Sequence, residues 1–179
     1  RQNLSGIYFH LSRYIKALSK CYRQNVVIEK EFKNFINSQT ELLEELQVMR
    51  DLLFRLDYEK DHRLNQMVNE LLLLIETREI ATIPLQDFVI IRENYPNSDL
   101  QIFFRDSFSK AGINLEEMGM YSLRAGDMLK RLGFKAELRA LEYELELLRR
   151  QDLEGEALEA YQIVANHFRK VWSLSRNLE

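Results

Sequence analysis

Proline and glycine are scarce in this chain, which has two prolines and six glycines among 179 residues. Neither occurs between Gly6 and Pro84. β-Sandwiches and α/β folds need turn residues at short intervals, so a stretch of this length without them excludes both classes. The sequence therefore predicts an all-α fold, an elongated helical bundle with long first and last helices and shorter helices between them.

Cysteine and long apolar runs are also lacking. Cys21 is the single cysteine, which excludes a disulfide framework, and its apolar surroundings predict a buried thiol in a reducing compartment. The longest apolar run extends from Leu71 to Ile75, far short of the ~20 residues that span a bilayer. We therefore expect no membrane span and a cytoplasmic location, with the chain as a whole protein or as the soluble part of a larger one.

Motifs of catalysis and cofactor binding are missing too. The sequence has no P-loop, no glycine-rich dinucleotide turn, no G-x-S-x-G and no zinc-type Cys/His spacing. Of His10, His62 and His167, only His62 completes a Glu-x-x-His pair, with Glu59, whereas a di-iron bundle needs two such pairs. We expect no enzyme activity, no cofactor, no metal and no small-molecule substrate.

The chain does contain an apolar stripe at heptad spacing from Ile7 to Leu56. Its steps alternate between four and three residues, which keeps one face of a helix against a partner. Tyr8, Ile15 and Tyr22 lie beside the stripe and widen it, which favours a bundle of three or more helices over a two-stranded coil. The polar exceptions in the stripe, Asn25 and Gln39, should each find a polar partner if they are buried.

Two helical units are predicted, at residues 1–80 and 81–179. The first is a long helix or a hairpin covering about residues 5–79. The heptad phase passes through Ser38 without a slip, which favours a continuous helix there, and its change at residues 57–63 favours a stutter over a turn. The second unit is predicted to have helices at 84–94, 99–110, 115–132 and 135–175, with ends at Gly112 and Gly133 and a weak point at Gly155.

Four of the six glycines follow one period, at Gly112, Gly119, Gly126 and Gly133. Glycine inside a helix costs about 1 kcal/mol relative to alanine. The repeat therefore predicts a close approach of another helix or of a partner's backbone. A groove for an external peptide and a coincidental spacing are the other interpretations.

These features predict a helical protein–protein interaction module, which would act as a scaffold, an adaptor or an assembly subunit through a protein partner or through self-association. Trp172 is either an interface anchor or a residue that closes the bundle. The candidate partner-binding residues are Leu42, Leu46, Leu53, Gly112, Gly119, Gly126, Gly133 and Trp172.

A basic stripe supports a second hypothesis. Arg13, Lys16, Lys20 and Arg23 are spaced by three, four and three residues, which places them on one helical face. Basic side chains of this kind can bind nucleic-acid phosphates or an anionic membrane surface. The alternative is that the stripe pairs with the acidic segment at residues 41–61 or faces water.

Residues 65–175 distantly resemble the cytoplasmic helical domains of type II secretion F proteins and of the sporulation stage III AB family. The resemblance is carried by Ile83-Pro84-Leu85, by Phe103-Phe104 and by Leu132-Gly133 before a glutamate-rich helix. It implies a cytoplasmic assembly domain of a secretion-type membrane complex. The sequence departs from the pattern at Phe88, where those families have a small residue.

Overall fold

The computed structural model describes residues 2–55, 62–76, 83–94, 99–121 and 127–176. Within these ranges the secondary structure is helical, which confirms the all-α prediction. The helices are α1 (Gln2–Lys20), α2 (Ile28–Arg55), α3 (His62–Glu76), α4 (Leu85–Asn94), α5 (Asp99–Tyr121), α6 (Asp127–Arg149) and α7 (Gly155–Arg176).

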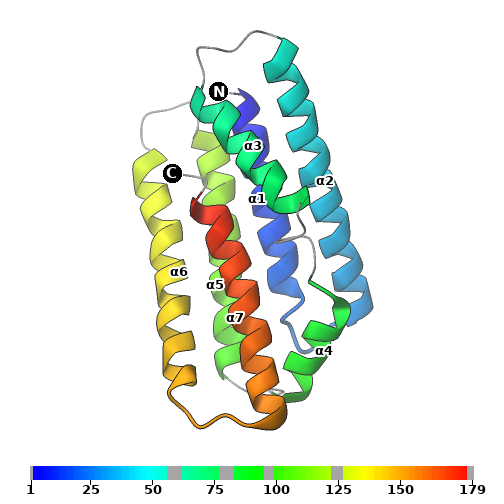
Figure 1. The fold of residues 1–179 in the computed structure, drawn as a ribbon, viewed down its shortest axis with the longest axis vertical. Coiled ribbons are helices and arrows are strands. Elements are labelled where there is room, and N and C mark those ends of the chain that lie inside the picture. Colours follow the sequence, from blue (N-terminus) through cyan, green and yellow to red (C-terminus); the bar gives the residue numbers. More distant parts are fainter. Residues whose placement is uncertain (1, 56–61, 77–82, 95–98, 122–126, 177–179) are drawn as a thin grey trace.

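The long helices α1, α2, α5, α6 and α7 run along the long axis of the bundle (Figure 1). The chain reverses direction between α1 and α2, between α5 and α6, and between α6 and α7. Helix α1 packs between α2 and α5, and its contact with α5 is the most extensive in the molecule. A helix with neighbours on both sides needs a wide apolar face, which is why its stripe includes Tyr8 and Ile15 as well as the heptad positions.

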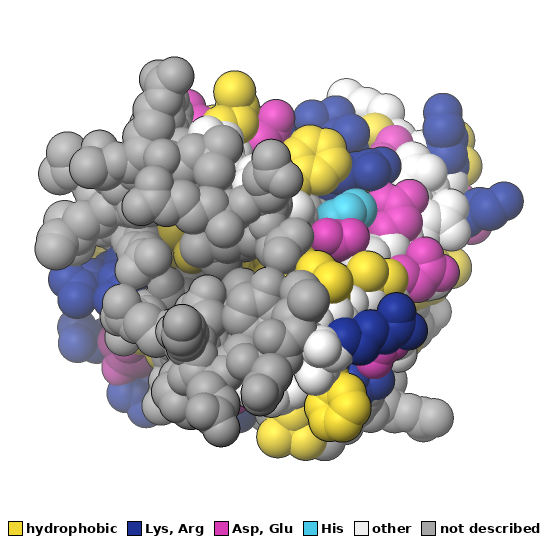
Figure 2. Space-filling view, turned by 90° about the horizontal axis from the view of Figure 1, so that it is seen from above, with side chains coloured by type: hydrophobic (Ala, Val, Ile, Leu, Met, Phe, Trp, Pro, Cys, Tyr) yellow, Lys and Arg dark blue, Asp and Glu magenta, His cyan; other side chains and the backbone are white. Residues whose placement is uncertain are grey.

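One hydrophobic core joins the described helices. It contains residues of all seven, from Ile7 in α1 to Leu174 in α7. Since α1 lies along α5, the predicted units 1–80 and 81–179 share this core. Figure 2 looks onto the end of the bundle where α1 begins, and the described part of that surface carries acidic, basic and hydrophobic side chains intermixed.

The chain turns between Lys20 and Ile28, so residues 5–79 do not form the single long helix that was one of the two predicted forms. The amides at positions 21–23 donate to carbonyls three residues earlier, a tightening that commonly ends a helix. Cys21 and Tyr22 remain buried after the helix has ended, so the apolar stripe continues although the helix does not. Asn25 is exposed in this turn. A polar partner was expected for it only if its side chain were buried, so that expectation does not apply.

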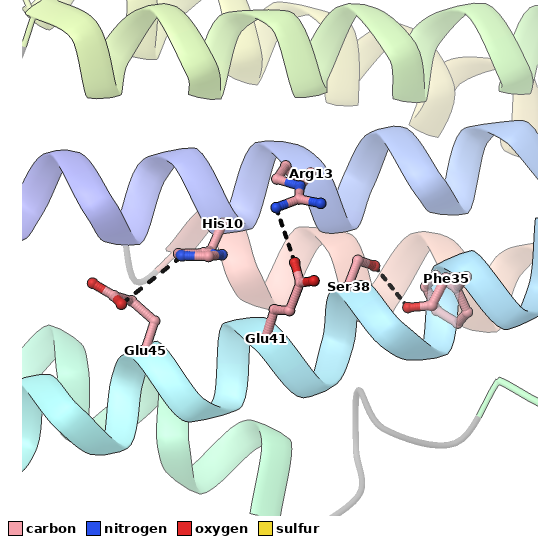
Figure 3. Close-up of polar contacts among 6 residues, drawn as sticks. All are labelled: His10, Arg13, Phe35, Ser38, Glu41 and Glu45. Atoms are coloured by element: carbon pink, nitrogen blue, oxygen red, sulfur yellow. Dashed lines mark hydrogen bonds and ion pairs between the residues drawn. The ribbon is translucent and has the colours of Figure 1, made fainter.

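Helix α2 is continuous through Ser38, as the heptad phase predicted. The Ser38 hydroxyl donates to the Phe35 carbonyl at 2.7 Å within the same helix (Figure 3). The predicted stutter at residues 57–63 falls largely on residues 57–61, which lie outside the described residues.

The second half of the chain differs from the prediction at its helix ends. Gly112 lies inside α5 and Gly133 inside α6, so neither glycine ends a helix. The helix predicted over residues 135–175 is two helices, because α6 ends at Arg149 and α7 begins at Gly155. The weak point at Gly155 is confirmed by its backbone φ of +58°.

We expect Gly155→Ala to lower the free energy of unfolding by about 1 kcal/mol, because the left-handed conformation is less favourable by roughly that amount for a residue with a Cβ. No atom lies within 4 Å of the position of an added Cβ, so the loss would come from the backbone alone. Urea denaturation followed by circular dichroism measures it. An unchanged midpoint would show that this residue does not hold the left-handed conformation in solution.

Candidate functional site

The α1–α5 contact is built around two glycines. A Cβ on Gly119 would lie 3.0 Å from the Ser5 carbonyl oxygen and 3.2 Å from the Tyr8 Cβ. A Cβ on Gly112 would lie 2.5 Å from the Lys16 Cγ and 3.2 Å from the Ser12 carbonyl oxygen. The close approach of a helix, predicted from the glycine repeat, is therefore confirmed at Gly119, and the approaching helix belongs to the same chain. Gly112, which was predicted to end a helix, lies in the same contact.

Two serines of α1 bond to these same glycines. Ser5 Oγ donates to the Gly119 carbonyl at 2.6 Å, and Ser12 Oγ donates to the Gly112 carbonyl. The serines are seven residues apart, as the glycines are, so one antiparallel register satisfies both pairs. We did not identify the serines from the sequence, although their matching period was a usable signal.

The other candidate residues have different surroundings. Gly133 faces the Asn114 side chain of α5. A Cβ added to Gly133 would lie 3.5 Å from Asn114 Nδ2, which is an ordinary van der Waals distance. Gly126 lies outside the described residues. Trp172 is half-buried against the core and stacks on Phe168, with 6.1 Å between the ring centroids.

The three leucines proposed for partner binding, Leu42, Leu46 and Leu53, lie in the core. They pack on the inner face of α2, where they stabilise the bundle itself. A partner would reach them only if α2 moved away from the rest of the chain.

The basic stripe is divided between different neighbours. Arg13 forms an ion pair with Glu41 of α2 at 3.0 Å (Figure 3), and Lys16 forms one with Glu116 of α5. His10 Nε2 lies 3.9 Å from a Glu45 carboxylate oxygen on the same side as Arg13.

Lys20 and Arg23, the other two residues of the stripe, are exposed. Lys20 is the last residue of α1, and Arg23 lies in the turn between α1 and α2. Half of the stripe therefore joins helices of this chain. The pairing with the acidic segment at 41–61, one of the two predicted alternatives, is seen for Arg13.

A buried polar network joins three distant parts of the chain next to that turn. His167 of α7 has no exposed surface, and its two ring nitrogens lie 2.6 Å from Tyr22 Oη and 2.8 Å from Asp87 Oδ2. The Asp87 carboxylate can only accept, so Nε2–H donates to it and Nδ1 accepts from the Tyr22 hydroxyl. This arrangement satisfies a neutral imidazole completely.

The surroundings of the network are aromatic. The His167 ring lies 6.0 Å from the Tyr22 ring and 5.3 Å from the Phe88 ring, measured between centroids. Burial lowers the pKa of His167 below its ordinary value, and the Asp87 carboxylate opposes this shift only in part. Burial raises the pKa of Tyr22 well above its ordinary value, so neither ring is charged near neutral pH. The network thus ties together the end of α1, α4 and α7.

Arg92 of α4 holds the turn itself. Its Nη2 donates to the Arg23 carbonyl and, at 3.3 Å, to the Val26 carbonyl. Cys21 is buried beside this turn, as predicted, and burial raises the pKa of its thiol to about 12, with a smaller contribution from Glu31. The thiol is therefore protonated and inaccessible.

The described residues contain neither a cluster of metal ligands nor a membrane span. In that part of the chain, no three His, Cys, Asp or Glu side chains gather as a metal site would need. No described helix combines the length and the hydropathy needed to cross a bilayer. Glu59 of the Glu-x-x-His pair lies outside the described residues.

One protein-family model matches nearly the whole chain, over residues 1–178, and it describes the FUSC-like inner membrane protein yccS. No curated protein and no solved structure matches the sequence. The family overturns two predictions, because an inner-membrane protein is neither a cytoplasmic protein nor a soluble interaction scaffold. Among the sequence-based alternatives, a part of a membrane complex comes nearest to it. The chain belongs to the FUSC-like family of the inner membrane protein yccS.

Proposed function

We propose that this chain forms a water-facing helical-bundle domain of an inner-membrane protein. The membrane association is supported by the family, and the water-facing position by the outward faces of the helices. On α6 those faces carry Arg139, Glu142 and Arg149, all exposed. A charged side chain in the middle of a bilayer costs about 2.5–3.5 kcal/mol on insertion scales, so a charged outer face favours contact with water.

The ion pairs on the surface support the same position. Arg13 with Glu41 and Lys16 with Glu116 are each only partly exposed and join adjacent helices. Surface pairs contribute up to about 1 kcal/mol in water. Their side chains belong at a protein–water boundary, outside the shared apolar core.

Labelling of an introduced cysteine tests this function. Cys21 is buried and protonated, so the parent protein provides an unreactive background. We expect the protein to be recovered with inner membranes, and Arg139→Cys to react with a water-soluble maleimide in unsealed membranes without detergent. Reaction only after detergent would show that lipid covers α6, and recovery of the protein without membranes would overturn the inner-membrane assignment.

The absence of enzyme activity stays a prediction. Tyr22, His167 and Asp87 are linked by hydrogen bonds, but both rings of the network are buried. We assign the network a structural role, in which it fixes α4 and α7 against the end of α1.

A further inference from the structure

The turn between α1 and α2 has a surface pocket of about 380 Å³ beside it. The pocket lies between this turn and the beginning of α5, and its lining combines apolar side chains with polar and cationic ones. Its lining residues include Tyr22, Arg23, Gln24, Asn25, Ile102 and Arg105. Among the described residues, the lining thus includes two arginines and two carboxamide residues and no carboxylate, which is a donor set suited to an anion.

The charges around the pocket favour an anion as well. Arg92 lies against the turn from α4 and occupies the carbonyls of Arg23 and Val26, so these acceptors are already satisfied. The Arg92 guanidinium also brings a third positive charge to the turn. Asp106 opposes this field, because it accepts from Arg105 Nε and lies 2.9 Å from Arg105 Nη2. Arg105 retains further donors, since a guanidinium carries five.

Large apolar side chains are exposed beside these cations. Val27 in the turn is 66% exposed and Ile102 at the pocket is 46% exposed. Lys20 and Lys30 are exposed on either side of the turn. Exposed apolar side chains among cationic ones are typical of surfaces that lie in the interfacial layer of an anionic membrane.

We propose that this pocket binds the phosphate of an anionic lipid headgroup and so fixes this end of the bundle on the membrane surface. Arg23 and Arg105 donate to the phosphate oxygens, and Val27 and Ile102 enter the interfacial layer. The proposal rests on the proposed function, since a water-facing domain of an inner-membrane protein has a lipid surface beside it. It uses Arg23, the last residue of the basic stripe, together with Arg105 of α5, whereas Arg13 and Lys16 of the stripe pair with Glu41 and Glu116.

Vesicle binding by the purified chain tests the proposal. We expect co-sedimentation with vesicles made of equal parts of phosphatidylglycerol and phosphatidylcholine, and none with phosphatidylcholine alone. Arg23→Gln and Arg105→Gln should each weaken binding by about 5-fold, the loss expected for one cationic residue at an anionic surface. Val27→Ser should also weaken vesicle binding, because it removes an apolar side chain from the interfacial layer. Added salt should reduce vesicle binding of the parent protein.

Arg139→Gln is the matched control, because it removes the same charge from the exposed face of α6. Its binding should equal that of the parent protein, and an equal loss in all three arginine variants would show general electrostatic attraction and overturn the pocket. A titration with inorganic phosphate separates the two sources of the anion. Phosphate binding that depends on Arg23 and Arg105, without vesicle binding, would assign the site to a free anion and overturn the lipid assignment.

The two proposals fail in different experiments. Loss of vesicle binding leaves the membrane recovery of the protein and the labelling of Arg139→Cys unaffected. Failure of those measurements would remove the proposed function whatever the vesicles show.

Discussion

Gly119→Leu is expected to lower the free energy of unfolding by about 3 kcal/mol, the upper end of what overpacking usually costs. Even its Cβ would lie 3.0 Å from the Ser5 carbonyl oxygen and 3.4 Å from the Phe9 amide nitrogen. These are backbone atoms of α1, so the clash is relieved only by moving α1 away from α5. That movement would also break the hydrogen bond from Ser5 Oγ to the Gly119 carbonyl.

Gly133→Ala is the matched control for this prediction. It also replaces a glycine inside a helix, but its Cβ would lie at an ordinary 3.5 Å from Asn114 Nδ2. We expect it to raise the free energy of unfolding by up to about 1 kcal/mol, through helix propensity alone. Urea denaturation of both variants measures the contrast. If Gly119→Leu unfolds at the parent midpoint, α1 and α5 are not this close in solution.

Ser5→Ala separates the hydrogen bond from the close approach. Removal of the hydroxyl leaves the glycine and its clearance intact, so the loss should be about 1 kcal/mol, the usual contribution of one hydrogen bond. A loss as large as that of Gly119→Leu would mean that the serine, and not the glycine, controls the contact.

The glycine repeat shows what the sequence can predict of this contact and what it cannot. The period of seven and the cost of glycine inside a helix were visible, and they predicted a close helical neighbour. The identity of the neighbour was not visible, because Ser5 and Gly119 are separated by 114 residues and only the folded bundle pairs them. The two glycines whose role was misjudged, Gly112 and Gly133, resemble helix-ending residues in sequence but lie inside helices.

The turn after α1 was missed for a related reason. Helix ends are usually marked by local signals, and neither glycine nor proline lies near Lys20. Here the turn is held by Arg92, whose guanidinium comes from α4, more than sixty residues later in the chain. The heptad pattern persisted because the buried Cys21 and Ile28 lie on either side of the turn and face the same core.

The error about location has a different origin. The cytoplasmic location was expected from the absence of a long apolar run, and that absence by itself does not exclude an association with the membrane. The inner-membrane location comes from the family match, because composition alone could not indicate it. A bundle that lies beside the bilayer, with its charged outer faces in water, agrees both with the absence of a long apolar run and with the inner-membrane family.

His167→Ala is expected to lower the free energy of unfolding by about 3 kcal/mol, because it leaves a cavity and removes the partner of one buried and one partly buried polar group. Tyr22 would lose its acceptor, and the Asp87 carboxylate, whose side chain is only 16% exposed, would lose its donor. Asp87→Asn should be milder, since its side-chain oxygen can still accept from Nε2–H. Equal losses in the two variants would contradict the assignment of hydrogen-bond partners.

The same network should make stability depend on pH. The pKa of His167 is lower in the folded protein than in the unfolded chain, where it is about 6.5. The unfolded state therefore binds more protons, so the stabilisation is complete above about pH 6.5 and is lost as the pH falls toward the folded pKa. The loss can reach about 1.4 kcal/mol per pH unit for one group. Two charged groups act on His167: the Asp87 carboxylate raises its pKa and the Lys170 ammonium lowers it.

Urea denaturation between pH 5 and pH 7 measures this dependence. His167→Gln should flatten the slope in this window, because glutamine does not titrate. His10→Gln is the comparison variant, because it removes a histidine that lies beside Glu45 at the α1–α2 surface and is not part of the network. A parent slope that survives His167→Gln would show that other groups cause the acid sensitivity. A slope lost only in His167→Gln would mean that one buried imidazole, joined to α1 and α4, couples the packing of α7 to pH.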